Sequence, residues 1–163
     1  GQPLGVLKDS RVTAVITLTP EEYASWNGWH KVKGKMKKAY RNGSFVMNQS
    51  TFDTGIDGME DKNGQPIAKV NYGTSGKPER TLLGRTVVLC DYVASYSAAL
   101  AKDTIFAFLF NFKDYVLNTN YSMGVKKYED NDTDDQITKG IMLVDGKVVD
   151  KNSLVVVKKI EAV

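Results

Sequence analysis

The residue types that most often carry enzymatic chemistry are scarce in this sequence. It contains one histidine, His30, and one cysteine, Cys90. A cysteine nucleophile needs a histidine beside it, but His30 lies in a lysine-rich stretch and Cys90 ends an apolar run typical of a buried strand. A structural zinc site needs several such ligands. We therefore expect neither a cysteine–histidine enzyme nor structural zinc, and an enzyme would have to act through carboxylates, such as Asp53 and Asp57.

Two stretches imitate a phosphate-binding loop, and neither fits its requirements. Residues 28–35 place one residue too many between the glycines, and Met36 follows where a hydroxyl side chain should hold magnesium. Residues 73–77 read Gly-Thr-Ser-Gly-Lys, but Pro78 follows. The sequence therefore predicts no nucleotide site.

Acidic residues concentrate in one short segment, which contains Glu129, Asp130, Asp132, Asp134 and Asp135. Their alternation resembles a calcium loop, but that loop needs glycine at its sixth position and glutamate at its twelfth, where this chain has aspartate and isoleucine. The segment is more typical of the solvated tip of a β-ribbon. We expect no metal and no cofactor.

Basic residues concentrate in residues 31–41, with no acid among them. The side of a helix that carries Lys31, Lys35, Lys38 and Arg41 could meet phosphate backbones without reading base sequence. Lysines also commonly cover the solvated face of an amphipathic helix, so this interpretation stays open beside the first. The net charge of +3 does not decide between them.

The composition is that of a soluble globular protein with one domain of ordinary size, or one domain and a small appendage. Of 163 residues, 42% are hydrophobic and 25% charged. No apolar run approaches the ~18 residues of a membrane span, so we expect no membrane partner. The sequence shows no signal-peptide pattern and has a single cysteine, which favours a reducing compartment.

Several apolar runs predict a sheet. Residues 82–91 indicate a turn at Gly84 that feeds a strand apolar on both faces, typical of the middle of a sheet. Residues 104–110 predict a second buried strand, with Phe106, Phe108 and Phe110 pointing one way. Further strands are predicted at residues 12–18, 44–48 and 154–157.

Helix signals are clearest at Thr19-Pro20-Glu21-Glu22, which combines an N-cap, a first-turn proline and a capping-box glutamate. Apolar residues then recur at helical spacing from Trp26 to Tyr40, which predicts one helix ended by Asn42-Gly43. Ser50 is expected to cap a second helix toward Glu60. Residues 97–102 predict a helical turn.

The remaining segments predict turns and a ribbon. Residues 65–80 are polar and rich in glycine and proline, which indicates a long surface loop. Residues 123–128 and 137–144 predict paired strands, and Asp145-Gly146-Lys147 predicts a hairpin turn. The expected fold class is α+β: a central mixed β-sheet flanked by helices, with a protruding β-ribbon from about Asn120 to Val149.

The ordered set of six short motifs resembles the major capsid proteins of tailed bacteriophages and prophages, with the Hong Kong 97-type fold. In chain order these motifs are Gly1–Leu7 (like Gly-x-Pro-x-Gly-Ile-Leu), Phe45–Asn48 (Trp-Val-Met-Asn), Asp61–Gly64 (Lys-Asp-x-x-Gly), Leu82–Val88 (Leu-Leu-Gly-x-Pro-Val-Val), Asn111–Tyr115 (Gly-Asp-Phe-Ser-x-Tyr) and Asp145–Val149 (Asp-Gly-x-Val-Val). Thr86 replaces the usual proline, and the Gly-Asp before Phe112 is missing. Lys139-Gly140 stands about where crosslinking members carry an asparagine, so crosslinking is not expected.

The resemblance implies a C-terminal fragment of a non-enzymatic shell subunit. Its expected parts are the end of a peripheral-domain segment (1–17), an axial domain (18–119), a peripheral ribbon (120–149) and a closing strand (150–163). Such subunits assemble into pentamers and hexamers of an icosahedral shell around double-stranded DNA, with scaffold and portal proteins as further partners. The expected location is the virion capsid, and the bacterial host cytoplasm during assembly.

The resemblance also suggests roles for three groups of residues. Lys69, Tyr72, Lys77 and Arg80 are expected near the capsomer axis. The acidic ribbon tip is expected to contact neighbouring capsomers, and the basic helix to face DNA. Two alternatives stay open, namely an encapsulin-like compartment shell and a small basic nucleic-acid-binding module.

Overall fold

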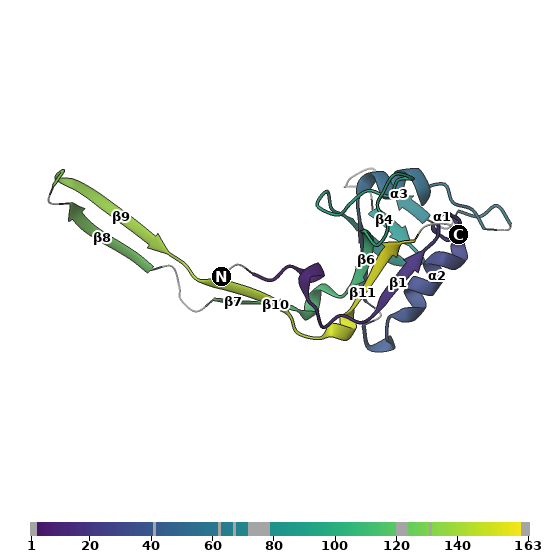
Figure 1. The fold of residues 1–163 in the computed structure, drawn as a ribbon, viewed down its shortest axis with the longest axis horizontal. Coiled ribbons are helices and arrows are strands. Elements are labelled where there is room, and N and C mark those ends of the chain that lie inside the picture. Colours follow the sequence, from purple (N-terminus) through teal and green to yellow (C-terminus); the bar gives the residue numbers. More distant parts are fainter. Residues whose placement is uncertain are drawn as a thin grey trace. The chain divides into compact units, whose positions relative to one another are not determined.

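A computed structural model describes residues 3–40, 42–61, 63–66, 68–71, 79–119, 124–130 and 132–160. The chain forms two compact units, which are treated separately below. The sheet unit comprises Ser10–Asp114 and Asp150–Val163, and the ribbon unit comprises Gly1–Asp9 and Tyr115–Val149. Figure 1 labels the helices and strands of both units.

The sheet unit holds three α-helices and seven strands among its described residues. Its helices are α1 (Pro20–Tyr23), α2 (Trp26–Lys35) and α3 (Gln49–Gly55); its strands are β1 (Val15–Leu18), β2 (Ser44–Met47), β3 (Ala68–Asn71), β4 (Glu79–Leu82), β5 (Arg85–Leu89), β6 (Ile105–Phe110) and β11 (Leu154–Lys159). The ribbon unit holds β7 (Tyr115–Thr119), β8 (Gly124–Asp130), β9 (Asp135–Ile141) and β10 (Val144–Val148).

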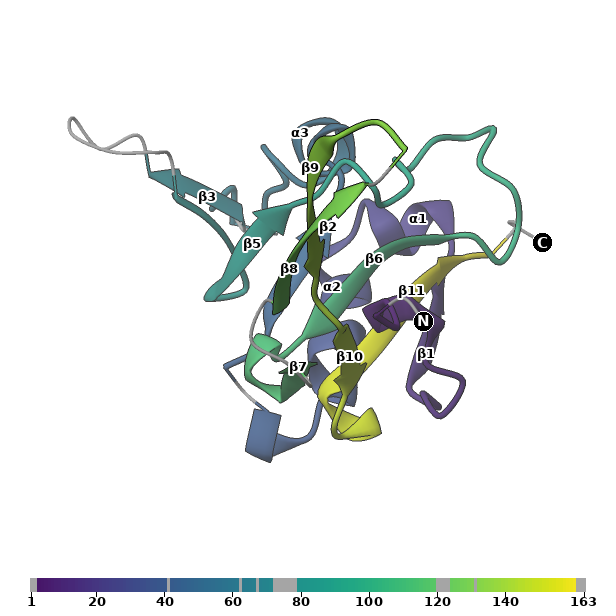
Figure 2. The same ribbon diagram turned by 90° about the vertical axis from the view of Figure 1, so that its left-hand side faces the viewer.

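The seven strands form one mixed sheet in the order β1-β11-β6-β2-β5-β4-β3. The β1–β11 and β2–β5 pairs are parallel, and the other pairs are antiparallel. Figure 2 shows β6 between β11 and β2. The predicted α+β class with a central mixed sheet is therefore confirmed.

The most buried strands are β6 and β11, as their apolar runs predict. The expectation that β5 is covered on both faces is wrong, because Val88 is 39% exposed while its neighbour Val87 is buried. The predicted glycine turn before β5 is present. Leu83 and Gly84 both have positive φ, 52° and 74°, which suits a two-residue hairpin between β4 and β5.

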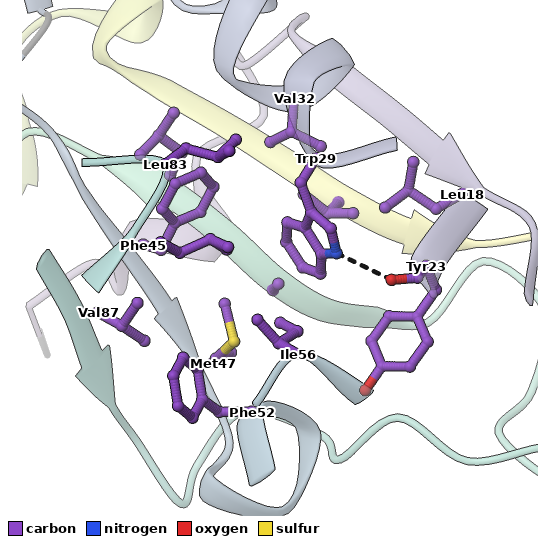
Figure 3. Close-up of a cluster of buried hydrophobic side chains, with 14 of the residues drawn as sticks. Leu18, Tyr23, Trp29, Val32, Phe45, Met47, Phe52, Ile56, Leu83 and Val87 are labelled. Carbon is purple, nitrogen blue, oxygen red and sulfur yellow. Dashed lines mark hydrogen bonds between the residues drawn. The ribbon is translucent and has the colours of Figure 1, made fainter. Parts of the chain in front are cut away.

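One hydrophobic cluster joins the helices to the sheet (Figure 3). Trp29 of α2 and Phe52 of α3 are fully buried against Phe45 and Met47 of β2. Phe106 joins this cluster and makes edge contacts with Tyr23 and Trp29, instead of following Phe108 to the other face. A register shift explains this, since Val157 pairs with Ala107 and Lys158 with Ile105, which leaves Phe106 as a bulge residue.

The predicted capping box is confirmed, but the predicted single helix is wrong. The Thr19 hydroxyl accepts from the Glu22 amide at 3.2 Å, and the Glu22 carboxylate accepts from the Thr19 amide at 3.3 Å. The helix nevertheless ends at Tyr23, whose carbonyl accepts from the Trp29 indole at 2.9 Å. Ser25 caps a new helix, α2, which ends at Lys35. Tyr40 lies in a separate 3-10 turn, Lys38–Tyr40.

Two smaller predictions also fail. Asn48 caps α3, since its side-chain oxygen accepts from the Ser50 amide, two residues earlier than the predicted cap at Ser50. Residues 97–102 form turns and no helix. The buried Lys159 ammonium accounts for this, because it donates hydrogen bonds to the backbone carbonyls of Ser97, Ala98 and Leu100 at 2.9, 2.6 and 2.9 Å. These carbonyls are therefore not paired within a helix.

The predicted loop at residues 65–80 is a loop only in part. Residues Ala68–Asn71 form β3 and Glu79–Leu82 form β4, and the two strands pair antiparallel. Residues 72–78 lie outside the described part of the chain. The turn signal before β3 is correct, because the Asp61 carboxylate accepts from the amides of Asn63 and Gln65.

The ribbon unit contains two separate two-stranded sheets, β7–β10 and β8–β9, where one ribbon was predicted. The predicted hairpin turn at Asp145-Gly146-Lys147 is wrong, since Gly146 lies within β10 opposite Leu117. A Cβ at Gly146 would lie 2.5 Å from the Tyr115 hydroxyl oxygen, so the glycine admits the tyrosine ring. That hydroxyl donates to the Leu4 carbonyl, and the Leu4 amide donates to the Gly146 carbonyl.

Candidate assembly surfaces

The β8–β9 ribbon carries an ordered charge pattern. Seven residue pairs lie directly opposite each other, from Gly124–Ile141 to Asp130–Asp135. Each such pair is called a rung here, and the two residues of a rung share a face while successive rungs alternate. One face therefore presents four rungs in order, Gly124–Ile141, Lys126–Lys139, Tyr128–Ile137 and Asp130–Asp135, and this set is named the tyrosine face.

The opposite face of the ribbon is mixed in character. It holds the rungs Val125–Gly140, Lys127–Thr138 and Glu129–Gln136, and a hollow of about 350 Å³ lies beside the last two rungs and Tyr128. The structure gathers the predicted acidic residues at one end of the ribbon. Glu129, Asp132, Asp134 and Asp135 are exposed, and Asp130 lies in β8 opposite Asp135. That this end contacts a neighbour stays a prediction.

The ribbon unit exposes an unusual amount of apolar surface. Its exposed large hydrophobic side chains include Val116, Leu117, Val125, Tyr128, Ile141, Met142, Leu143 and Val149. Among its described residues, burial is confined to Asp9, Gly146 and Val148. Two-stranded sheets with so little core are marginal in water, and large exposed apolar patches mark interaction surfaces. The unit is therefore suited to burial against other polypeptide surface.

The predicted basic helix is only partly assembled. Lys31 and Lys35 lie on α2 and are exposed, whereas Lys38 lies in the separate 3-10 turn and Arg41 outside the described residues. Lys31 forms an ion pair with Glu22. The hydrogen bond from Lys31 holds the pKa of the Glu22 carboxyl below its usual value. Lys31 is thus already neutralised within the fold, which leaves Lys35 and Lys38 as the exposed candidates for a phosphate contact.

The predicted axis residues do not form one described cluster. Lys69 lies in β3, and Tyr72 and Lys77 lie outside the described part of the chain. Arg80 lies in β4 and is half-buried, with its guanidinium carbon 6.0 Å from the centre of the Phe52 ring. Its Nε atom is buried without a hydrogen bond. Arg80 therefore packs inward against α3, which a sequence rich in turn signals did not indicate.

Two exposed aromatic residues were missed by the sequence patterns. Trp26 begins the helical spacing of apolar residues that runs to Tyr40, but it is 38% exposed. Its ring contacts the His30 ring at a tilt of 48°, with 4.4 Å between ring centres, and it lines a hollow of about 510 Å³ with Glu60 and Asp61. Tyr92 is fully exposed while the adjacent Val93 is buried. Ser25 was the sequence signal that could have indicated the exposure of Trp26. As the N-cap it starts a new helix, and Trp26, the first residue of that helix, points outward.

The described part of the chain was compared with the requirements of a metal site and of a membrane-spanning helix, and it meets neither. No three acidic, histidine or cysteine side chains there lie close enough together to hold a metal ion. No helix there is long and apolar enough to cross a membrane. Cys90 is a half-buried free thiol.

Comparison with known proteins gives a consistent result. The model of the phage capsid family matches residues 1–159. The capsid of an empty GTA particle is similar in structure, with a TM-score of 0.58 and 19% identity over 83% of this chain and 44% of that one. A solved structure from Gordonia phage Cozz has a TM-score of 0.51 and 16% identity, over 97% of this chain and 55% of that one.

A shell from outside the phages is also similar. The holo-SrpI encapsulin complex from Synechococcus elongatus has a TM-score of 0.57 and 13% identity, over 94% of this chain and 55% of that one. This chain spans about half the length of these solved proteins. No curated protein matches the sequence. At these identities the solved structures establish a shared Hong Kong 97-type fold.

Proposed function

Because this chain belongs to the phage capsid family, whose members are structural and non-enzymatic shell proteins, we propose that it forms pentamers and hexamers of an icosahedral shell that encloses double-stranded DNA. The observation that carries this proposal is the family match over residues 1–159, which spans both compact units. The unburied apolar surface of the ribbon unit supports it, because a shell subunit buries such surface in its neighbours.

Within the shell, the sheet unit takes the role of the axial domain and the ribbon unit that of the peripheral domain. The sequence assigns residues 18–119 and 150–163 to the first role and residues 1–17 and 120–149 to the second. Residues of the β3–β4 hairpin, with Lys69, Tyr72, Lys77 and Arg80, lie near the capsomer axis. The acidic end of the β8–β9 ribbon contacts neighbouring capsomers, where charge favours register more than affinity.

The gene product that carries this sequence provides the direct test. We expect closed shells or ring-shaped capsomers in negative-stain electron micrographs of the purified soluble protein. Analytical ultracentrifugation of the same sample should show a large species in place of a monomer. A protein that stays monomeric at every concentration and salt level tested contradicts the proposal.

DNA contact within the shell is assigned to the exposed lysines Lys35 and Lys38, together with Arg41. Non-specific phosphate contacts are salt-dependent, because cationic side chains release counterions when they bind. The double variant Lys35→Glu, Lys38→Glu should still assemble while retaining less DNA, measured by absorbance of nuclease-treated particles. Lys31→Glu is the matched control on the same helix, since Lys31 is paired with Glu22. Equal DNA retention in both variants argues against this face.

An encapsulin-like compartment is the second candidate, favoured by the similarity to the SrpI encapsulin complex over 94% of this chain. Both candidates predict shells, and they differ in content. Particles purified from the native host should contain nuclease-protected double-stranded DNA under the first candidate and a protein cargo under the second. Portal and scaffold partners, and assembly in the host cytoplasm, follow from the first candidate alone.

A further inference from the structure

We infer that the tyrosine face of the β8–β9 ribbon binds the same face of a second copy, with a twofold axis through the Tyr128–Ile137 rung. This inference rests on the proposed function, since it names the partner of one surface of the shell subunit. It is argued from three of the four rungs on that face: Lys126–Lys139, Tyr128–Ile137 and Asp130–Asp135.

The three rungs are evenly spaced. The lysine rung lies two residues from the tyrosine rung toward the open end of the ribbon, and the aspartate rung lies two residues from it toward the turn. Two residues of an antiparallel strand span about 6.8 Å. A rotation by 180° about the tyrosine rung therefore places the lysine rung of each ribbon over the aspartate rung of the other. The pattern is self-complementary in the way that an isologous interface requires.

Each ribbon alone contains two rungs of like charge, and pairing with a second copy offsets the electrostatic repulsion within them. Lys126 is in register with Lys139, and Asp130 with Asp135, and residues of like charge at paired positions in a sheet are destabilising. A two-stranded ribbon has little stability to spare. Opposite charge from a second copy offsets both repulsions at once. A ribbon tip that only needed to be solvated would gain nothing from facing like charges in two separate rungs.

The centre of the face is suited to burial. Tyr128 is 53% exposed and lies opposite Ile137, which is half-buried. An aromatic side chain surrounded by polar groups is the usual arrangement of an interface hot spot, and the surrounding charges then fix register. The opposite face lacks this charge order, because its rungs pair a valine with glycine, a lysine with threonine and a glutamate with glutamine.

DNA does not fit the tyrosine face as a partner. The aspartate rung would repel phosphates in the same region where the lysine rung attracts them. A ring of ribbons, each with its acidic end on the lysine rung of the next, would use the charges but would leave Tyr128 away from any symmetry axis. The twofold pair uses all three rungs, and the ring is therefore an outcome that the test must separate.

Cysteine crosslinking in the full chain tests the twofold axis. Tyr128→Cys is made in a Cys90→Ser background, because Cys90 is the chain's own thiol. Two sheets packed face to face lie about 10 Å apart, beyond the Cα separation of about 7 Å that a disulfide bridges, so a thiol-reactive crosslinker that spans about 10 Å is used. We expect a crosslinked dimer with this reagent. The matched control is Lys127→Cys, the adjacent residue on the opposite face, which should stay monomeric.

Salt should modulate the crosslinking. The Debye length falls from about 10 Å at 0.1 M salt to about 3 Å at 1 M, which weakens the attraction between the two ribbons. The yield of crosslinked dimer should therefore fall as the salt concentration is raised. Equal yields from positions 127 and 128 overturn the inference, because they indicate random collision. No dimer at position 128 under conditions where shells form overturns it as well.

Charge exchange tests the rungs. Two variants each reverse the charge of one rung: Lys126→Glu with Lys139→Glu, and Asp130→Lys with Asp135→Lys. Each variant keeps like charges within its rungs but leaves both rungs of the face with the same sign, so each should lose the Tyr128→Cys dimer. A mixture of the two, or one chain carrying all four changes, should regain it. If the fourfold variant folds but does not regain the dimer, the charges do not set the contact. If charge exchange rescues assembly without a position-128 dimer, the ring is correct and the twofold pair is wrong.

Electron microscopy of the same samples separates this inference from the proposed function. Shells without position-128 dimers refute the twofold ribbon contact and leave the shell role intact. Position-128 dimers without shells or capsomers establish the contact and refute the shell role.

Discussion

The sheet unit and the ribbon unit differ in where their apolar side chains go. In the sheet unit, residues such as Trp29, Phe45 and Phe106 are fully buried in one cluster between helices and sheet. In the ribbon unit, comparable side chains such as Leu117 and Tyr128 are more than half exposed. The first unit carries its own core, whereas the second has apolar surface that only another polypeptide surface can cover. In a capsid family this difference separates a stable body from an assembly element.

The largest expected effect on the free energy of unfolding comes from a variant that removes a core side chain of the sheet unit. Trp29→Ala should lower the free energy of unfolding by about 3–5 kcal/mol, because it deletes a fully buried indole and the hydrogen bond to the Tyr23 carbonyl. Trp26→Ala on the same helix is the control, since Trp26 is 38% exposed, and about 1 kcal/mol or less is expected. Denaturant titration followed by far-ultraviolet circular dichroism measures both. Similar losses in the two variants would mean that the cluster does not dominate stability.

A second test concerns two glycines of α2. A Cβ at Gly28 would overlap the backbone carbonyl of Glu22, which is where α1 gives way to α2. Gly28→Ala should therefore cost about 1–3 kcal/mol. A Cβ at Gly34 would meet nothing within 4 Å, so Gly34→Ala should stabilise the protein by about 0.5–1 kcal/mol through helix propensity. Thermal unfolding measures the two shifts, and equal signs would contradict the close approach of the two helices.

These glycines show what sequence patterns could and could not predict. The strand at residues 104–110 and the capping box at Thr19 were predicted correctly, because their signals are local runs of residue types. The break between α1 and α2 was missed, because it depends on the Trp29 indole reaching the Tyr23 carbonyl, a contact that exists only in the folded chain. A continuous helical spacing from Trp26 to Tyr40 concealed it.

The ribbon unit was predicted less well for a similar reason. Gly146 follows an aspartate and precedes a lysine, which is typical of a turn, yet it lies within β10 beneath the Tyr115 ring. The bulge that redirects Phe106 likewise depends on pairing with β11. The acidic end of the ribbon was predicted from composition alone. Its division into lysine, tyrosine and aspartate rungs requires the register of β8 with β9, which residue spacing does not fix.

A third test asks whether the ribbon unit opens without the sheet unit. Gly146→Ala places a methyl group 2.5 Å from the Tyr115 hydroxyl oxygen and 2.8 Å from a Leu117 methyl carbon. Hydrogen exchange of the β7 amides should accelerate, while the unfolding midpoint of the sheet unit should not move. Gly140→Ala is the control, since a Cβ there meets nothing within 4 Å. A falling midpoint for Gly146→Ala would show that the two units unfold together.

The smallest expected effect is electrostatic, and it is measured as the pH dependence of unfolding free energy in variants of the two units. The Lys31 hydrogen bond lowers the pKa of Glu22 in the folded protein, so this group contributes stability above its ordinary pKa of 4.5 that is lost as pH falls through the lowered folded value. The pair is largely solvated, which limits the contribution to roughly 0.2–1 kcal/mol after screening. Glu22→Gln should therefore flatten part of the acid limb of unfolding free energy against pH. Glu129→Gln, which removes an exposed carboxylate from the ribbon unit, is the control for the change in net charge, and a flattening of equal size in this variant would mean that net charge, rather than the Lys31 hydrogen bond, accounts for the change.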